Sequence, residues 1–171
     1  MVHKLGHFGC IVNDWAKEMD WYTSNFNLVP SDVQHAPDNE DLDVIAFMHL
    51  DLGKRFTDHH SMFLARAQPG ENDRMHHTSF EIENFDTQLL GHEWLASKGY
   101  TAVWGVGRHI LGSQIFDYWK DPSGFTIEHY ADGDLVNTDI PTMRSAAGPL
   151  AIWGPEFPKD FSEDTTRAFG S

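Results

Sequence analysis

Residues 77–82 read His-Thr-Ser-Phe-Glu-Ile, and they repeat the character of residues 7–12, which read His-Phe-Gly-Cys-Ile-Val. Both runs begin with a histidine, alternate in polarity and end before a polar pair. A period of two is typical of a β-strand with one buried face. The sequence therefore predicts two copies of one structural unit, opened by His7 and His77.

A helix is expected after each opening strand. In the first copy, apolar residues recur at helical spacing at Trp15, Met19, Tyr22 and Phe26. In the second copy, the apolar side consists of Phe85, Leu89, Leu90, Trp94 and Ala96. These spacings predict amphipathic helices whose apolar sides face a sheet, and Lys98-Gly99 provides a helix end in the second copy.

Three strands are expected after each helix, separated by turn residues such as Gly53, Gly107 and the run Asp121-Pro-Ser-Gly124. The expected ranges are about 29–36, 42–51 and 59–67, and then 101–106, 112–119 and 125–130. The predicted fold class is α+β, with two βαβββ modules over about 3–67 and 75–131. We expect them to form a half-open barrel around a metal cleft.

The domain is expected to span residues 1–135, and an extended, proline-rich tail to span residues 136–171. Prolines punctuate short apolar segments in this tail, whereas the residues after Phe161 are polar. An extended tail lying on the surface of the domain is therefore expected, with a disordered polar end.

The charge balance excludes several classes of partner. The chain has 12 Lys and Arg against 26 Asp and Glu, a net charge of −14, so nucleic acids and anionic membranes would repel it. No apolar run is long enough to span a membrane, and Cys10 is the single cysteine. These features predict a soluble, cytoplasmic protein.

Eleven histidines make a metal site worth seeking. His7 and His77 occupy equivalent positions, and Glu128 lies in an apolar run where an unpartnered carboxylate would be costly. The first copy offers Ala65 in the place of Glu128. Two histidines and one carboxylate suit non-heme Fe(II) with open positions. His76 points to the opposite strand face and Glu81 is expected to be exposed. No role is expected for His3, His35, His49, His92 and His129.

The run from His109 to Glu128 reads His-Ile-Leu-Gly-Ser-Gln-Ile-Phe-Asp-Tyr-Trp-Lys-Asp-Pro-Ser-Gly-Phe-Thr-Ile-Glu. With Gly6-His-Phe-Gly9 and Met75-His-His-Thr-Ser-Phe80, it resembles the vicinal oxygen chelate superfamily and, within it, the catalytic domain of the type I extradiol ring-cleavage dioxygenases. The family pattern is a histidine, a tyrosine nine residues later, an Asp-Pro-x-Gly turn and a ligand glutamate. Asp117 departs from this pattern, because the family has an apolar residue there.

The resemblance implies roles for individual residues. His7, His77 and Glu128 would bind Fe(II), or Mn(II) in some members. His109 and Tyr118 would donate hydrogen bonds to substrate oxygens. A further catalytic histidine would be His60 or His59, and His60 is favoured.

The implied function is insertion of O2 into a small aromatic diol of the catechol type, as in aromatic hydrocarbon catabolism. The cleft wall is expected to include Trp104, Ile110, Phe116 and Trp153. The alternatives are a metal-dependent isomerase or thiol transferase resembling glyoxalase I, and a metal-free binding module. A homo-oligomer is expected, and the chain is either a one-domain enzyme or a fragment.

Overall fold

The computed structural model describes residues 1–159 and Phe161, and the predicted polar end lies outside them. The chain divides into two compact units. The first unit consists of His7–Met75 and Asp134–Gly148. The second unit consists of Met1–Gly6, His76–Gly133 and the described residues from Pro149 onward. Each unit contains one of the two predicted modules.

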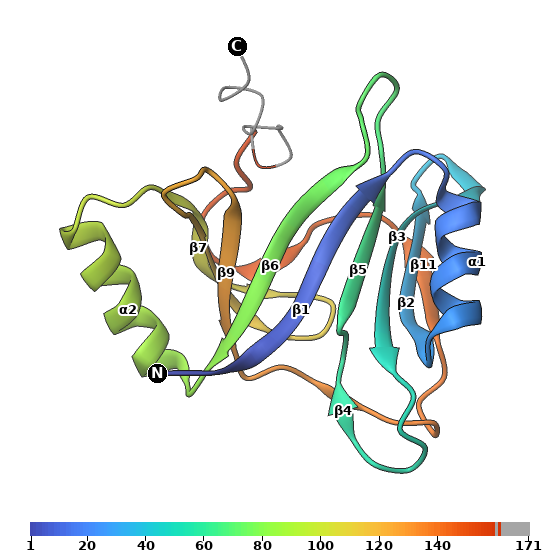
Figure 1. The fold of residues 1–171 in the computed structure, drawn as a ribbon, viewed down its shortest axis with the longest axis horizontal. Coiled ribbons are helices and arrows are strands. Elements are labelled where there is room, and N and C mark those ends of the chain that lie inside the picture. Colours follow the sequence, from blue (N-terminus) through green and yellow to red (C-terminus); the bar gives the residue numbers. More distant parts are fainter. Residues whose placement is uncertain (160, 162–171) are drawn as a thin grey trace. The chain divides into compact units, whose positions relative to one another are not determined.

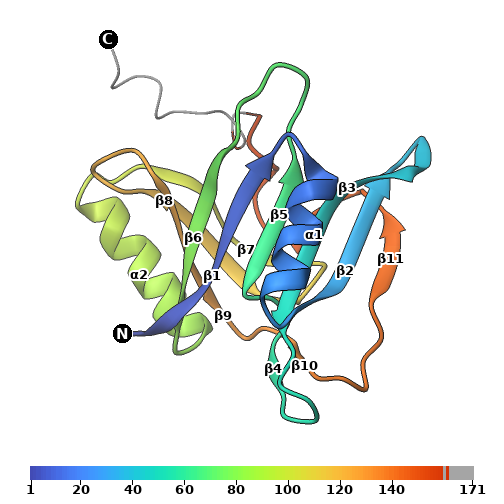
Figure 2. The same ribbon diagram turned by 45° about the vertical axis from the view of Figure 1, so that its right-hand side comes forward.

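The first unit has the predicted order of strand, helix and three longer strands (Figure 2), and it also contains the two-residue strand β4 and two strands from the C-terminal part of the chain. Its elements are β1 (Val2–Val12, from His7 onward), α1 (Trp15–Asn25), β2 (Leu28–Ala36), β3 (Asn39–Leu50), β4 (Thr57–Asp58), β5 (Met62–Arg66), β10 (Leu135–Val136) and β11 (Met143–Ala146). The sheet order is β11-β2-β3-β5-β1, and β10 pairs with β4. The last predicted strand starts later than expected, since residues 59–61 connect β4 to β5.

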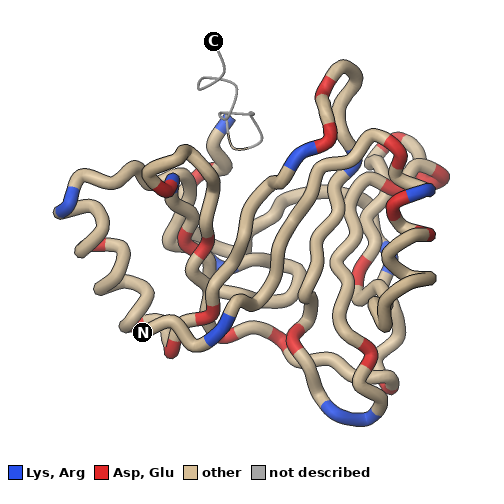
Figure 3. The backbone as a smooth tube through the Cα atoms, viewed as in Figure 1, with Lys and Arg blue, Asp and Glu red and all other residues tan. Residues whose placement is uncertain are grey.

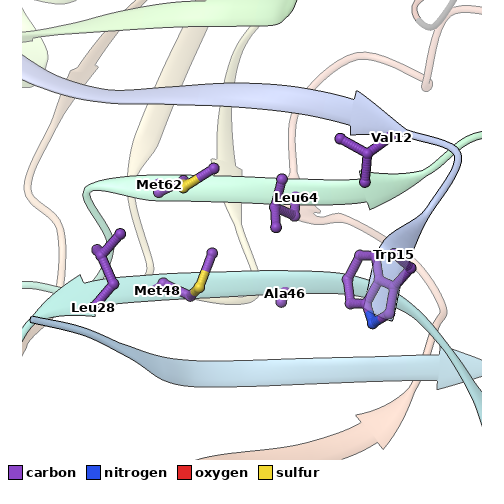
Figure 4. Packing of buried hydrophobic residues seen from close by; sticks show 7 residues of the cluster. All are labelled: Val12, Trp15, Leu28, Ala46, Met48, Met62 and Leu64. Atoms are coloured by element: carbon purple, nitrogen blue, oxygen red, sulfur yellow. The ribbon is translucent and has the colours of Figure 1, made fainter. Parts of the chain in front are cut away.

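An apolar core joins α1 to this sheet, and Figure 4 shows its buried side chains. It is formed by Val12, Trp15, Leu28, Ala46, Met48, Met62 and Leu64. Asp14 caps the helix by accepting a hydrogen bond from the backbone N–H of Lys17. Phe26 was expected on the buried side, but it is 52% exposed because it follows the helix in an extended conformation.

Replacing Leu64 with Ala is expected to lower the free energy of unfolding by about 2–5 kcal/mol, because the fully buried side chain would leave a cavity. Urea denaturation measures the change. Leu42 of β3 is 37% exposed, and the matched change Leu42→Ala is expected to cost much less. Equal losses for both variants would contradict this assignment of the core.

The second unit repeats the same connectivity (Figure 1). Its elements are β6 (Arg74–Ile82, from His76 onward), α2 (Phe85–Ser97), β7 (Ala102–His109), β8 (Ile115–Lys120), β9 (Thr126–Ala131) and β12 (Ala151–Trp153). The sheet order is β6-β9-β8-β7-β12. In each unit the opening strand pairs in parallel with the last strand of its module. The predicted α+β class with two βαβββ modules is therefore confirmed, and their closure around one cleft stays a prediction.

The strand pairings correct the expected equivalence of Ala65 and Glu128. Glu128 pairs with Ser79, two residues after His77. In the first unit, the residue two positions after His7 pairs with Phe63. Phe63 therefore occupies the place of Glu128, two residues earlier than expected. The inference that the first module has no carboxylate there is unchanged.

Helix α2 faces its sheet with the side opposite to the predicted one. Its buried residue is Gln88, whose side-chain amide donates to the backbone carbonyl of His129. The expected apolar side is exposed, by between 41% and 66% at Phe85, Leu89, Leu90 and Trp94. The reason is that the face of the sheet that packs against α2 carries Asp117, which pairs with His92 of the helix. Buried polar groups require such partners.

Acidic residues outnumber basic ones along the described chain (Figure 3). Salt bridges join some of the basic residues to them, as between Arg108 and Asp132 in the second unit. In the part of the chain that the structure describes, every helix is too short or too polar to cross a membrane.

Candidate metal centre

Three predicted site residues come together on one face of the second unit's sheet. Because Ser79 of β6 pairs with Glu128 of β9, His77 lies two residues away on the same face. On the other side of β9, Tyr118 of β8 lies directly opposite Glu128. His77 is 5% exposed and Glu128 is completely buried. The strand pairings thus hold an imidazole, a carboxylate and a phenol side by side, all of them buried.

The spacing of His77 and Glu128 fits two ligands of one divalent ion. Nε2 of His77 lies 3.6 Å from Oε2 of Glu128. This is longer than an ordinary hydrogen bond, but shorter than twice the metal–ligand distance of about 2.0–2.2 Å. Nδ1 of His77 interacts with Nδ1 of His76 at 2.6 Å. A partner on the second ring nitrogen is typical of metal-binding histidines.

His109 and Tyr118 form a hydrogen-bonded pair beside the carboxylate. Nδ1 of His109 donates to the carbonyl of Leu150 at 3.1 Å, because a carbonyl oxygen can only accept. In the neutral ring, Nε2 is then the acceptor, and it lies 3.0 Å from the Tyr118 hydroxyl. Burial, and then the negative charge of Glu128, raise the pKa of Tyr118 well above its usual value. Tyr118 therefore stays protonated at neutral pH and can donate.

Aromatic side chains surround Tyr118. The rings of Trp104 and Phe116 lie 4.0 Å apart and pack around it, with Phe161 at 4.9 Å from the tyrosine ring. Trp104 and Phe116 were expected in a cleft wall and are buried here. Ile110 and Trp153, expected in the same wall, are 43% and 42% exposed. The buried rings fix the position of the phenol.

The other predicted site residues lie in the first unit. His7 of β1 is 2% exposed, and its ring centroid lies 4.2 Å from that of His60. His59 instead directs Nε2 to a carboxylate oxygen of Asp32 at 2.6 Å. Of the two histidines left open by the sequence, His60 is the one whose ring contacts His7, and its catalytic role stays a prediction.

Several residues near these sites were missed by the sequence analysis. Asp32 carries no recognisable signal, because it lies in a strand of mixed polarity. Leu150 acts through its backbone carbonyl, which no side-chain pattern reveals. Phe161 was given no role, and was named only as the last residue before the polar end. The departure at Asp117 was a usable signal, since a buried carboxylate in a strand requires partners, and these are His92 and Trp119. Burial is the main cause of the raised pKa of Asp117.

The chain was compared with known protein families and proteins. The model of the glyoxalase/bleomycin resistance protein/dioxygenase superfamily matches residues 4–129. Metapyrocatechase 2 of Cupriavidus necator is 30% identical over 165 residues, which are 95% of this chain and 48% of the relative.

Solved structures share the fold. Homoprotocatechuate 2,3-dioxygenase of Brevibacterium fuscum, in complex with 3,4-dihydroxyphenylacetate, has a TM-score of 0.80 at 18% identity, covering 95% of this chain and 50% of its own. The Mn(II)-bound glyoxalase of Novosphingobium aromaticivorans has a TM-score of 0.73 at 20% identity, covering 92% and 50%. The chain thus spans about half the length of the relatives it matches.

Proposed function

Because the chain belongs to the glyoxalase/bleomycin resistance protein/dioxygenase superfamily, we propose that it is an Fe(II)-dependent extradiol dioxygenase acting on a catechol-like aromatic diol. The observation that carries this proposal is the His109–Tyr118 pair at the carboxylate of Glu128. A hydrogen-bond donor next to a metal ligand can stabilise the negative charge that a substrate oxygen develops during the reaction. The similarity to metapyrocatechase 2 supports the same reaction type.

We propose His7, His77 and Glu128 as the metal ligands, a donor set able to hold one ion. Support for His7 comes from its neighbour Gly6, which belongs to the second unit and packs against the ring of Tyr130. Tyr130 lies on β9, two residues after Glu128. Gly6 and His7 are joined by a peptide bond, with their Cα atoms about 3.8 Å apart. The contact of Gly6 with Tyr130 therefore also limits where the backbone of His7 can lie. Two imidazoles and a carboxylate with open positions favour Fe(II), and Mn(II) accepts the same ligands.

The side chains have distinct roles in the proposed reaction. A divalent ion held by His7, His77 and Glu128 would supply Lewis-acid chemistry that lowers the pKa of the substrate hydroxyl groups. The hydroxyl proton of Tyr118 turns from Nε2 of His109 to the substrate oxygen that develops charge, and His109 keeps the phenol in place. His60 takes up a hydroxyl proton and returns it to the product. Both atoms of O2 enter the product as the ring opens beside the hydroxyl-bearing carbons, so no external reductant is needed.

Oxygen uptake by the reconstituted protein tests this function. The protein is loaded with Fe(II) without oxygen and then mixed with aerated catechols, including 3,4-dihydroxyphenylacetate. One O2 consumed for each diol is the expected result. Fully loaded protein that consumes no O2 with any diol would refute the proposal, and Mn(II)-dependent isomerisation of a hemithioacetal would then favour the glyoxalase alternative, whose fold is shared.

Replacing Gly6 with Ala is expected to weaken Fe(II) binding and to destabilise the fold by about 1–3 kcal/mol, because a methyl group would collide with the Tyr130 ring. Metal titration and urea denaturation measure both effects. A Cβ at Gly91 of α2 would contact nothing, so Gly91→Ala is expected to raise stability by about 0.5–1 kcal/mol and to leave the affinity unchanged. Wild-type binding and stability in Gly6→Ala would show that Gly6 does not anchor His7.

We also propose that the chain forms a homo-oligomer. The exposed apolar residues of α2 favour a second copy as the partner, since large apolar patches mark interaction sites. Light scattering should give a mass at least twice 19.5 kDa. A monomeric mass for the wild-type protein at high concentration would contradict this, and so would a mass that Leu90→Ser and Trp94→Ser leave unchanged.

A further inference from the structure

A chain of buried polar side chains leads to His60 in the first unit. Asp32 of β2, His59 and His60 are 8%, 5% and 3% exposed. Nε2 of His59 lies 2.6 Å from Oδ2 of Asp32. Nδ1 of His59 lies 3.2 Å from Nδ1 of His60. The three side chains thus form a continuous series of two hydrogen bonds.

The segment that carries both histidines is held rigidly. The hydroxyl of Ser31 donates to the backbone carbonyl of His59 at 2.5 Å. Having used its proton, the same hydroxyl accepts from Nδ1 of His49 at 2.7 Å. The ring of Phe47 packs against His60 with centroids 5.0 Å apart. The orientation of the two imidazoles is therefore fixed by contacts on several sides.

The order of donors and acceptors determines which nitrogen of His60 carries a proton. A carboxylate only accepts, so Nε2 of His59 holds a proton and donates it to Asp32. In neutral His59, Nδ1 is then an acceptor. Nδ1 of His60 must supply the proton of the second hydrogen bond. In neutral His60, Nε2 is consequently unprotonated and able to act as a base.

We propose that Asp32 and His59 are positioning residues that keep the proton of His60 on Nδ1 and so present Nε2 to the substrate hydroxyl. This proposal rests on the proposed dioxygenase function, in which His60 takes up that proton. Neither residue touches the reacting atoms in this proposal. The carboxylate of Asp32 acts on His60 only through the imidazole of His59, by way of the two hydrogen bonds.

The protonation of His60 can be read without metal or substrate. Nitrogen-15 NMR of histidine-labelled, metal-free protein at about pH 8, above the usual imidazole pKa near 6.5, distinguishes the two tautomers. We expect His60 with a protonated Nδ1 and an unprotonated Nε2. A proton on Nε2 of His60 in the wild-type protein would overturn the proposal, and this measurement requires no variant.

The variant Asp32→Asn tests the cause. An amide can donate as well as accept, so His59 is no longer held in one form and the Nε2-protonated tautomer of His60 should appear. Asp117→Asn is the matched control, because Asp117 is also a buried carboxylate bonded to an imidazole, that of His92. It should leave the His60 signals unchanged. An unchanged His60 in Asp32→Asn, or the same change in both variants, would overturn the proposal.

Steady-state kinetics of the Fe(II)-loaded protein link the tautomer to the reaction. Asp32→Asn should lower kcat by about 10- to 100-fold, the usual effect of losing such a supporting contact, with unchanged metal content and a KM within about twofold of the wild type. Wild-type kcat in this variant would overturn the positioning role. If wild-type protein itself consumes no O2, the proposed function fails, whereas the NMR result still decides whether the pair fixes the His60 tautomer.

Discussion

Replacing Glu128 with Gln is expected to weaken Fe(II) binding by at least about 100-fold. Loss of a supporting contact alone costs a metal site about 10- to 100-fold, and Glu128 is proposed as a direct ligand. The neutral amide also removes the negative charge that offsets the charge of the cation in a buried site. Anaerobic titration with Fe(II), followed by metal analysis after gel filtration, measures the change.

Glu81→Gln is the matched control for this change. Glu81 lies on β6 and forms a partly exposed ion pair with Lys4 at 3.4 Å. The same loss of one charge is expected to leave the Fe(II) affinity unchanged. If Glu128→Gln bound Fe(II) as tightly as the wild type, Glu128 would not be a ligand.

Replacing Tyr118 with Phe is expected to lower kcat by about 10²- to 10³-fold, the effect of removing one donor from a developing negative charge. The metal content should not change, because the ring can keep its packing against His77 at 5.4 Å and Trp104 at 5.9 Å. Oxygen uptake under saturating diol measures kcat.

The control for Tyr118→Phe is Tyr22→Phe, which removes a hydroxyl from the partly buried side of α1. We expect wild-type kcat in this variant. A kcat in Tyr118→Phe within about twofold of the wild type would exclude the phenol as the donor to a developing charge.

The strands and helices were largely predictable because their signals are local. Alternating polarity located the strands of both modules, and Lys98-Gly99 marked the end of the second helix. The buried side of α2 was not predictable from its own sequence. It depends on Asp117 and His129, which lie in strands that the chain reaches only later.

The candidate site was predictable as far as the internal repeat and the run from His109 to Glu128 allowed. The repeat indicated His77, and the spacing in that run indicated Tyr118. The sequence left His59 and His60 open, because a change of register by one residue exchanges the strand faces, and the choice of His60 stays a prediction. Asp32 could not be identified, since it lies 27 residues before its partner His59.

Anomalous diffraction at the iron absorption edge, from crystals grown without oxygen and loaded with Fe(II), identifies the residues that bind the metal. We expect one iron peak per chain, about 2.0–2.2 Å from an imidazole nitrogen of His7, Nε2 of His77 and the carboxylate of Glu128. A loaded crystal with no iron peak at these residues, or with iron bound there without His7, would contradict this expectation.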